Sequence, residues 1–358
     1  PPMEPIWSRL AQALTEANRA MTQTVESPRL WPVDVSQLVR GLEDPDAQVR
    51  RVVMVSLGNV DAAAAERLRL LKRGLGDQSP MVRYEAVRVY SRTSQATDCA
   101  PIVAAIDDRS AHVALAAIDA LGDGCPGGPN AVKRLMALAD SIPAAGQAWH
   151  RATHAFVSLA GLSRPDATRR LPRFAEHPIW QVRMYAARAA VALAARGRLE
   201  RLAQDRHDNV REAAVAGLLS LRGHESDAVY IDALARRDYQ LVLTAANALK
   251  GSPNGARALP ALLTAFTRIT AERRDTSRDP RIAILDRVRE FGAKTQAAAL
   301  RSCLADFDPM VAGHCAATLQ AWTGTPHTAK PAAPTSPVLA PAARRARITM
   351  RGKGPFEL

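Results

Sequence analysis

Two histidines on one predicted helix are the residues whose spacing best fits metal chemistry. His150 and His154 are four residues apart, so both side chains would lie on one helix face, a spacing that can hold zinc. No acidic residue stands next to the first histidine, and no third ligand suggests itself nearby. Hydrogen-bonded or exposed histidines are therefore favoured, and we predict no metal and no cofactor. His177 and His207 fall in predicted turns and are interpreted as caps.

The four cysteines could carry disulfide chemistry. Cys99 begins the first helix of a predicted helix hairpin and Cys125 follows its second helix, so the two would be neighbours and a bond between them is feasible. The alternative is two reduced, partly buried thiols. A bond would imply an oxidising compartment, which favours a periplasmic or secreted location over a cytoplasmic one. Cys303 and Cys315 lie at unequal distances from their turn and are expected to be free and buried.

Catalytic motifs are not evident in the sequence. It contains no glycine-rich phosphate loop, no Ser/His/Asp grouping and no paired-carboxylate motif. We therefore predict no catalytic residue, and whether the parent protein is an enzyme is left open.

The basic net charge is spread along the chain. Lysine and arginine number 48 against 35 acidic residues, giving +13. Part of this excess lies in residues 330–358, and the rest is distributed thinly. Solvated arginine faces with apolar stems are favoured over a dedicated nucleic-acid surface. The sequence has no long uncharged apolar run, so no membrane span is predicted.

A repeated segment organises most of the chain. Leu42–Arg50, Leu75–Arg83 and Gln204–Arg211 share a turn with Asp followed by a Val-Arg pair. Apolar anchors recur about every 33 residues, which predicts about nine units. The anchors are Val49, Val82, Val113, Val182, Val210, Leu241 and Val311, with blurred copies near 151–159 and 282–291.

The spacing inside each unit predicts two helices. Counted from the arginine, apolar residues recur one before and three, four and seven after, which is the stripe of a helix and not the alternation of a strand. The residue three after the arginine is almost always alanine, so neighbouring helices can approach closely. With 4% aromatic residues and abundant alanine, the fold class is predicted to be all-α.

The Asp and Arg of each turn predict a structural ladder. Asp44 and Arg50, like Asp77 and Arg83, are six residues apart. The carboxylate can cap the second helix, and the arginine can reach the turn of the next unit. We expect Arg211→Ala to lower the thermal midpoint. The ladder should be interrupted where Ala114 and Val242 replace the arginine.

This turn and the following Val-Arg and Ala pattern resemble HEAT repeats, especially the short bacterial HEAT-like type of phycobilisome lyases. The resemblance covers 35–323 and implies an α-solenoid of the armadillo type. It also implies a binding scaffold, because solenoids of this kind mostly bind partners.

The two ends differ from the repeats. Residues 1–34 are expected to cap the array, since Ile6, Leu10, Ala13, Leu14 and Ala17 recur at helical spacing within 6–25. Residues 324–342 form a Pro/Ala-rich linker. Residues 343–358 are expected to begin a β domain that continues beyond the chain.

The stretch 346–358 is similar to the opening strand pair of cyclophilin-type peptidyl-prolyl isomerases. Bacterial chains that fuse HEAT-like repeats to such a domain resemble this one over most of its length. The resemblance implies a role in protein folding and an isomerase domain after Leu358, none of whose substrate-binding motifs occurs here.

The predicted binding surface is the exposed side of the second helices. Its mixed charges suit a protein or peptide client better than a phosphate backbone. A nucleic-acid-binding array of the DNA alkylation repeat type is the alternative, and the oligomeric state is left open. A charged insertion over 272–279 is either a binding loop or a solvated one. The candidate residues are Arg51, Tyr84, Arg88, Asp119, Arg188, Glu212, Asn247, Arg273 and Arg274.

Overall fold

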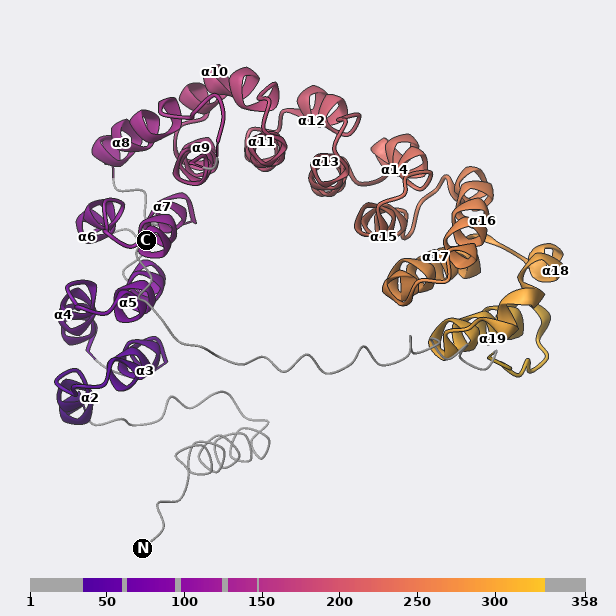
Figure 1. The fold of residues 1–358 in the computed structure, drawn as a ribbon, viewed down its shortest axis with the longest axis horizontal. Helices are drawn as coiled ribbons and strands as arrows, with labels where there is room; N and C mark the ends of the chain where they lie inside the picture. Colours follow the sequence, from indigo (N-terminus) through magenta and orange to yellow (C-terminus); the bar gives the residue numbers. More distant parts are fainter. Residues whose placement is uncertain (1–34, 60–62, 94–97, 124–127, 147, 332–358) are drawn as a thin grey trace, which may run out of the picture. The chain divides into compact units, whose positions relative to one another are not determined.

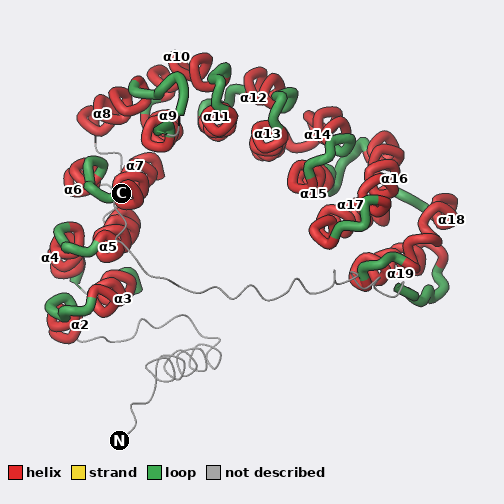
Figure 2. The backbone as a smooth tube through the Cα atoms, viewed as in Figure 1, coloured by secondary structure: helices red, strands yellow, loops and turns green. Residues whose placement is uncertain are grey.

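The computed structural model describes residues 35–59, 63–93, 98–123, 128–146 and 148–331. Within these ranges every regular element is helical (Figure 2). The predicted cap over 1–34, the greater part of the linker and the predicted β start over 343–358 lie outside the described residues. The chain divides into two units, residues 1–217 and 218–358, which are described separately below.

Unit 1 is built of helix hairpins in chain order. Each hairpin pairs a first helix with a second helix across a short turn. The pairs are α2 (Val35–Gly41) with α3 (Ala47–Leu57), α4 (Ala64–Leu75) with α5 (Pro80–Thr93), α6 (Ala100–Ala105) with α7 (Ala111–Asp123), α8 (Gly128–Asp140) with α9 (His150–Leu162), α10 (Arg164–Ala175) with α11 (Trp180–Ala192), and α12 (Arg196–Leu202) with α13 (Asp208–Arg222).

The second helices of unit 1 form one row. Neighbours from α3 to α11 pack side by side, and Figure 1 shows them along the inner side of the curved row, with the first helices outside. Within the described residues, the solvent-exposed side chains of these second helices form the surface that the sequence predicts as the binding site.

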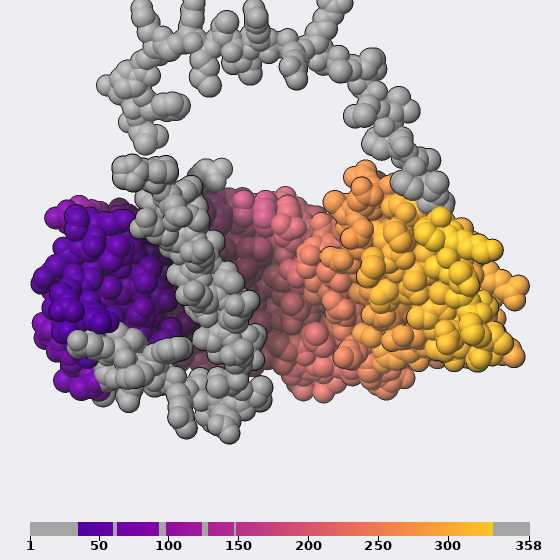
Figure 3. Space-filling model, turned by 90° about the horizontal axis from the view of Figure 1, so that it is seen from below, coloured from indigo at the N-terminus to yellow at the C-terminus, as the bar shows by residue number. Residues whose placement is uncertain are grey.

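Unit 2 follows the same plan, with first helices of unequal length. Its helices are α14 (Asp227–Ala233), α15 (Tyr239–Ala248), α16 (Gly255–Ala271), α17 (Arg278–Phe291), α18 (Ala297–Leu300) and α19 (Pro309–Thr323), with 3₁₀ segments η1 (Gly223–Ser226), η2 (Asp275–Ser277), η3 (Lys294–Gln296) and η4 (Arg301–Ala305). In the space-filling view the described residues of this unit form a continuous surface on the face shown (Figure 3, orange to yellow).

Small residues set the close packing of the second helices, as the sequence predicts. The residue three after the ladder position has at most 1% of its surface exposed at Ala86, Ala117, Ala186, Ala214 and Ala245. Two backbones come close at Gly122 of α7, where an added Cβ would lie 2.8 Å from the Cα of Ser158 on α9. Glycine, which has no Cβ, lets the two backbones come so near. The fold is therefore an all-α solenoid of nine HEAT-like hairpins within the described ranges.

The charged insertion over 272–279 is mostly not a loop. Residues Asp275–Ser277 form η2, and α17 begins at Arg278. Arg278 donates from Nε to Asp308 Oδ2 at 2.6 Å. Only residues 272–274 connect α16 to this helical start, so the extra residues lengthen the hairpin.

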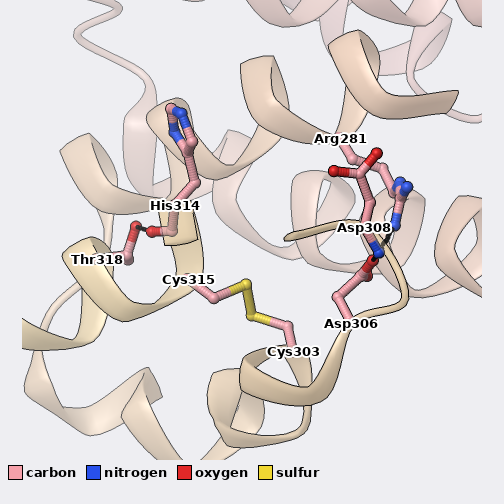
Figure 4. The surroundings of a disulfide bond; sticks show 7 residues. All are labelled: Arg281, Cys303, Asp306, Asp308, His314, Cys315 and Thr318. Atoms are coloured by element: carbon pink, nitrogen blue, oxygen red, sulfur yellow. Dashed lines mark hydrogen bonds and ion pairs between the residues drawn. A yellow bond between two sulfur atoms is a disulfide. The ribbon is translucent and has the colours of Figure 1, made fainter. Parts of the chain in front are cut away.

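Cys303 and Cys315 are not free, contrary to the prediction, because they form a disulfide (Figure 4). Their Cα atoms are 6.0 Å apart, a separation that a disulfide spans. The prediction assumed two α-helices and therefore unequal distances from the turn. Cys303 lies instead in η4, and a 3₁₀ segment rises about 2.0 Å per residue against 1.5 Å in an α-helix. The longer rise reduces the mismatch with α19.

Cys125 lies outside the described residues, so its bond to Cys99 stays a prediction.

Candidate protein-binding surface

The candidate residues of unit 1 lie on the second helices. Arg51 is on α3, Tyr84 and Arg88 are on α5, Asp119 is on α7, Arg188 is on α11 and Glu212 is on α13. The structure gathers most of them into two clusters, one on α3 and α5 and the other on α7, α9 and α11. Glu212 is half-buried on α13.

The α3–α5 cluster is organised by a buried carboxylate. Glu85 has 4% of its surface exposed. Arg51 Nη2 donates to its Oε1 at 3.1 Å and Arg88 Nη1 donates to its Oε2 at 2.8 Å. The Arg88 guanidinium also lies 5.9 Å from the centre of the Tyr84 ring. Two half-exposed arginines thus share one buried charge, and the exposed Tyr84 ring lies beside them.

The second cluster is a chain of contacts across three hairpins. Asp119 Oδ1 on α7 lies 2.7 Å from His154 Nδ1 on α9, and Tyr185 Oη on α11 lies 2.8 Å from His154 Nε2. The Arg188 guanidinium lies 4.8 Å from the centre of the Tyr185 ring. Both imidazole nitrogens are therefore occupied by hydrogen-bond partners, as the favoured interpretation of His154 requires.

Burial raises the pKa of the Tyr185 phenol above its usual value of 10.0. The Arg188 guanidinium acts in the opposite direction, and the Asp119 carboxylate adds to the increase. A phenol with a raised pKa stays protonated at neutral pH. Tyr185 can therefore donate its hydrogen to His154.

Trp149 and His150 extend the aromatic part of this cluster. Their rings stack with centroids 3.7 Å apart, and the Trp149 ring lies 5.9 Å from the Tyr185 ring. His150 and His154 thus have different partners, and no group of three or more metal-binding side chains occurs in the part of the chain that the structure describes.

In unit 2 the candidate residues have separate surroundings. Asn247 is exposed on α15. Arg273 has a φ of 50° and its guanidinium lies 5.2 Å from the centre of the Phe307 ring. Arg274 is exposed in the connection before η2.

The ladder is present, and its rungs share one geometry. Arg83 donates from Nε and Nη2 to the two carboxylate oxygens of Asp108 in the next turn, at 2.7 and 2.8 Å. Its Nη1 donates to the carbonyl oxygens of Asp77 and Gln78 in its own turn. The same pattern joins Arg50 to Asp77 and Arg183 to Asp205. Each rung therefore fixes one hairpin on the next.

The carboxylates of the ladder also fix the turns that lead into the second helices. Asp108 Oδ1 accepts from the backbone N–H of Ser110, as Asp77 Oδ1 does from that of Ser79. The hydrogen bond from Arg83 lowers the pKa of Asp108, against the opposing effect of burial. The ladder thus holds this carboxylate ionised and ties it to both neighbouring hairpins.

Two ladder residues differ from the sequence prediction. Arg211 donates to Asp208 Oδ1, three residues earlier on its own helix, at 2.6 Å. In unit 2, Arg281 supplies a rung that the sequence did not reveal, with its Nη1 2.7 Å from both oxygens of Asp306 (Figure 4). Arg281 and Asp306 have no exposed side-chain surface. Ala114 and Val242 are buried and supply no rung.

His207 caps α13, as predicted, whereas His177 fixes the turn before α11. His177 Nδ1 accepts from the backbone N–H of Ile179, and His207 Nδ1 accepts from that of Asn209. Burial lowers the pKa of His177, which suits a neutral ring that accepts a hydrogen bond.

Comparisons with known proteins bear on the fold. The family model of HEAT repeats matches residues 35–122. This chain is an α-solenoid of HEAT-like hairpins. No curated protein matches it at a significant level, and no described helix is long and apolar enough to cross a membrane.

Several solved structures are similar to the solenoid at low sequence identity. The complex of CpcE and CpcF of phycocyanin lyase from Nostoc sp. PCC7120 is 17% identical, with 75% of this chain and 97% of that chain covered and a TM-score of 0.43. YibA of Escherichia coli is 16% identical, with coverage of 77% and 98% and a TM-score of 0.48. Importin beta is 13% identical, with coverage of 80% and 47% and a TM-score of 0.48.

Proposed function

We propose that this solenoid is a non-catalytic scaffold that binds a protein or peptide client on the second helices of unit 1. The observation that carries the proposal is the recurrence of an arginine over a tyrosine on that surface. Arg88 lies over Tyr84, and Arg188 lies over Tyr185. Arginine and tyrosine are the residues that most often dominate binding energy at protein interfaces.

The charges of this surface favour a protein partner over nucleic acid. Arg51 and Arg88 share the carboxylate of Glu85, and Asp119 is exposed beside His154. A phosphate backbone is bound by many unneutralised cations, whereas mixed and paired charges are usual at the rim of a protein interface. The surface therefore fits a polypeptide with apolar and charged side chains better than DNA.

The test compares two variants with a matched control in the full chain. Arg88→Ala and Arg188→Ala remove the cationic half of each pair, and Arg169→Ala removes an arginine from the outer helix α10, where its side chain is 67% exposed. The probe is an array of unstructured peptides, and a short DNA duplex is the comparison ligand. Loss of one binding hot spot costs about 2 kcal/mol, or roughly thirty-fold in affinity.

Weaker peptide binding by Arg88→Ala and Arg188→Ala, with Arg169→Ala unchanged, would support the scaffold. Equal binding by all three variants would remove this surface as the binding site. Tight binding of the duplex that falls steeply with salt would favour the DNA alkylation repeat alternative.

We also propose that the scaffold is tethered to a prolyl isomerase domain. The support is the resemblance of residues 346–358 to the first strand pair of cyclophilins. Cis–trans isomerisation of X-Pro peptide bonds is slow without catalysis. A tethered scaffold would raise the concentration of client near the isomerase. The encoded sequence after Leu358 tests this, since an unrelated domain there would refute it.

A further inference from the structure

Exposed large hydrophobic side chains are concentrated on two neighbouring helices of unit 1. Among the described residues, five of the six side chains of this kind lie on α3 or α5, and the sixth belongs to α19 in unit 2. The five are Val49, Val52, Val55, Met81 and Tyr84, with between 37% and 61% of their surface exposed. A group of exposed apolar side chains on adjoining helices is typical of an interaction site.

Three of these side chains share a helix face with two arginines. On α3, Val55 follows Arg51 by four residues. On α5, Tyr84 follows Met81 by three residues and precedes Arg88 by four. Residues three or four apart lie on the same face of a helix. Each helix therefore presents one stripe in which apolar side chains are mixed with a cation.

Contacts between α3 and α5 join the two stripes into one surface. The helices pack side by side along the inner side of the row (Figure 1). Gln48 Nε2 on α3 lies 3.9 Å from Met81 Sδ on α5. One turn further along, Arg51 Nη2 donates to Glu85 Oε1 at 3.1 Å. The 33-residue offset of the first contact sets each apolar side chain of one stripe opposite a polar or charged side chain of the other.

The two arginines carry more positive charge than their shared partner neutralises. Arg51 and Arg88 both donate to the buried carboxylate of Glu85, each to a different oxygen. Their side chains nevertheless remain 44% and 43% exposed. Each guanidinium has five N–H donors, so both retain donors for a second acceptor. One unit of positive charge is therefore left at the surface, where a carboxylate from a bound chain complements it and an ammonium group is repelled.

The cluster on α7, α9 and α11 lacks both features. None of its members is among the exposed large hydrophobic side chains of the described residues. Its Asp119 carboxylate is 47% exposed and would repel an acidic segment. The surface on α3 and α5 is therefore the better site for a segment that is both apolar and acidic.

We propose that the α3–α5 patch, made of Arg51, Val55, Met81, Tyr84 and Arg88, binds a client segment in which apolar side chains flank an aspartate or glutamate. The apolar side chains of the segment bury Val55 and Met81, and its carboxylate accepts hydrogen bonds from the two guanidiniums. The unbranched thioether of Met81 adapts to apolar side chains of different shape, so the patch selects composition more than one sequence. This inference rests on the proposed function and adds to it the chemistry of the client.

Three labelled peptides and the full chain test the patch. The peptides share one sequence of leucine, phenylalanine, serine and alanine residues and differ at a single central position, which is Glu, Gln or Lys. Val55→Ser and Met81→Ser remove apolar contacts, and Arg51→Ala removes one cation while Glu85 keeps its second arginine. Met310→Ser on α19 is the matched control, because Met310 is 55% exposed in unit 2. Fluorescence anisotropy at low and at physiological ionic strength measures the affinities.

We expect the Glu peptide to bind about ten-fold more tightly than the Gln peptide, and the Lys peptide to bind most weakly. Val55→Ser and Met81→Ser should each weaken binding of the Glu peptide by about five-fold, with Met310→Ser unchanged. Arg51→Ala should reduce the preference for Glu over Gln, as should added salt.

Equal affinities for the three peptides, or an equal effect of Met81→Ser and Met310→Ser, would overturn the proposal. If Arg188→Ala weakens peptide binding while Val55→Ser and Met81→Ser do not, the scaffold stands and the α3–α5 patch is not its binding site. Absence of binding by every peptide, including those of the array, would remove the proposed function together with this inference. A wild-type dimer that Met81→Ser converts to a monomer would assign the patch to a second copy of the chain.

Discussion

Removal of the Arg83 rung is the sharpest test of what holds unit 1 together. Arg83 has 5% of its surface exposed, and Arg83→Ala deletes two hydrogen bonds to Asp108 and two to the carbonyl oxygens of its own turn. The half-buried Asp108 carboxylate then loses its partner. Breaking a buried ion pair in this way costs about 3–5 kcal/mol.

The matched control is Arg69→Ala on α4. Arg69 pairs with Glu66 on its own helix, and 59% of its side-chain surface is exposed. Exposed pairs contribute about 0–1 kcal/mol. In urea unfolding followed by circular dichroism, Arg83→Ala should lower the midpoint by on the order of 1–2 M, and Arg69→Ala should leave it nearly unchanged.

The pH dependence separates the charge pair from simple loss of packing. Because the pKa of Asp108 is lowered in the folded chain, the rung contributes its full stability above the unfolded pKa of about 3.9. That contribution is lost as the pH falls through the lower folded value. The difference between wild type and Arg83→Ala should therefore be constant near neutral pH and shrink below about pH 4.

Two substitutions complete the test. Arg83→Lys keeps the charge but cannot form the paired contact, so its midpoint should lie nearer to that of Arg83→Ala than to the wild type. Arg83→Ala combined with Asp108→Asn should cost less than the sum of the two single changes. Additive effects, or a midpoint for Arg83→Ala no lower than that of Arg69→Ala, would refute the structural role of the rung.

Two further predictions concern close packing and the disulfide. Gly122→Ala should destabilise unit 1, because its Cβ would lie 2.8 Å from the Ser158 backbone. Gly313→Ala in α19, where nothing lies within 4 Å of an added Cβ, should stabilise unit 2 by about 0.5–1 kcal/mol. Thermal unfolding of both variants measures these changes, and a change of the same sign in both would contradict the prediction. Reduction of the bond between Cys303 and Cys315 should destabilise α19 by about 3 kcal/mol, and faster amide exchange in α19 would measure this loss. Alkylation of both cysteines in unfolded, non-reduced protein would show that the bond is not formed.

The repeat and the ladder were predictable because each depends on spacing along the chain. The turn Asp, the Val-Arg pair and the alanine three residues later recur at fixed offsets, and helix geometry converts these offsets into faces. The rung from Arg83 to Asp108 follows from that register. The rung from Arg281 was not predicted, because the charged insertion over 272–279 lengthens the distance between two repeats. The sequence placed this copy of the repeat near 282–291, with Ile282 as its apolar anchor, whereas the structure places Pro280 at the anchor position.

The clusters of the candidate surface could not be derived from the sequence. Glu85 joins two predicted residues, and His154 joins Asp119 to Tyr185. The inter-hairpin contacts among them link residues more than thirty positions apart, at helix positions where residue type changes from hairpin to hairpin. A repeat pattern predicts which positions meet, but not which side chains form a bond there. The disulfide was missed for a local reason, since the 3₁₀ form of η4 leaves no clear pattern.

The gap in the ladder has a mechanical consequence for unit 1. Guanidinium rungs clamp the hairpins from α3 to α7 at one end and join α11 to the turn before α13 at the other. Between them, Ala114 on α7 contributes no such clamp. Arg151 on α9 instead donates to the carbonyl oxygen of Ile106, and α7 and α9 pack closely at Gly122 and Ser158. A contact between small side chains resists separation but tolerates sliding better than a paired salt bridge does. We therefore expect elastic strain imposed on unit 1 to concentrate at this joint. The side-chain contacts from Asp119 through His154 to Tyr185 would respond to that strain.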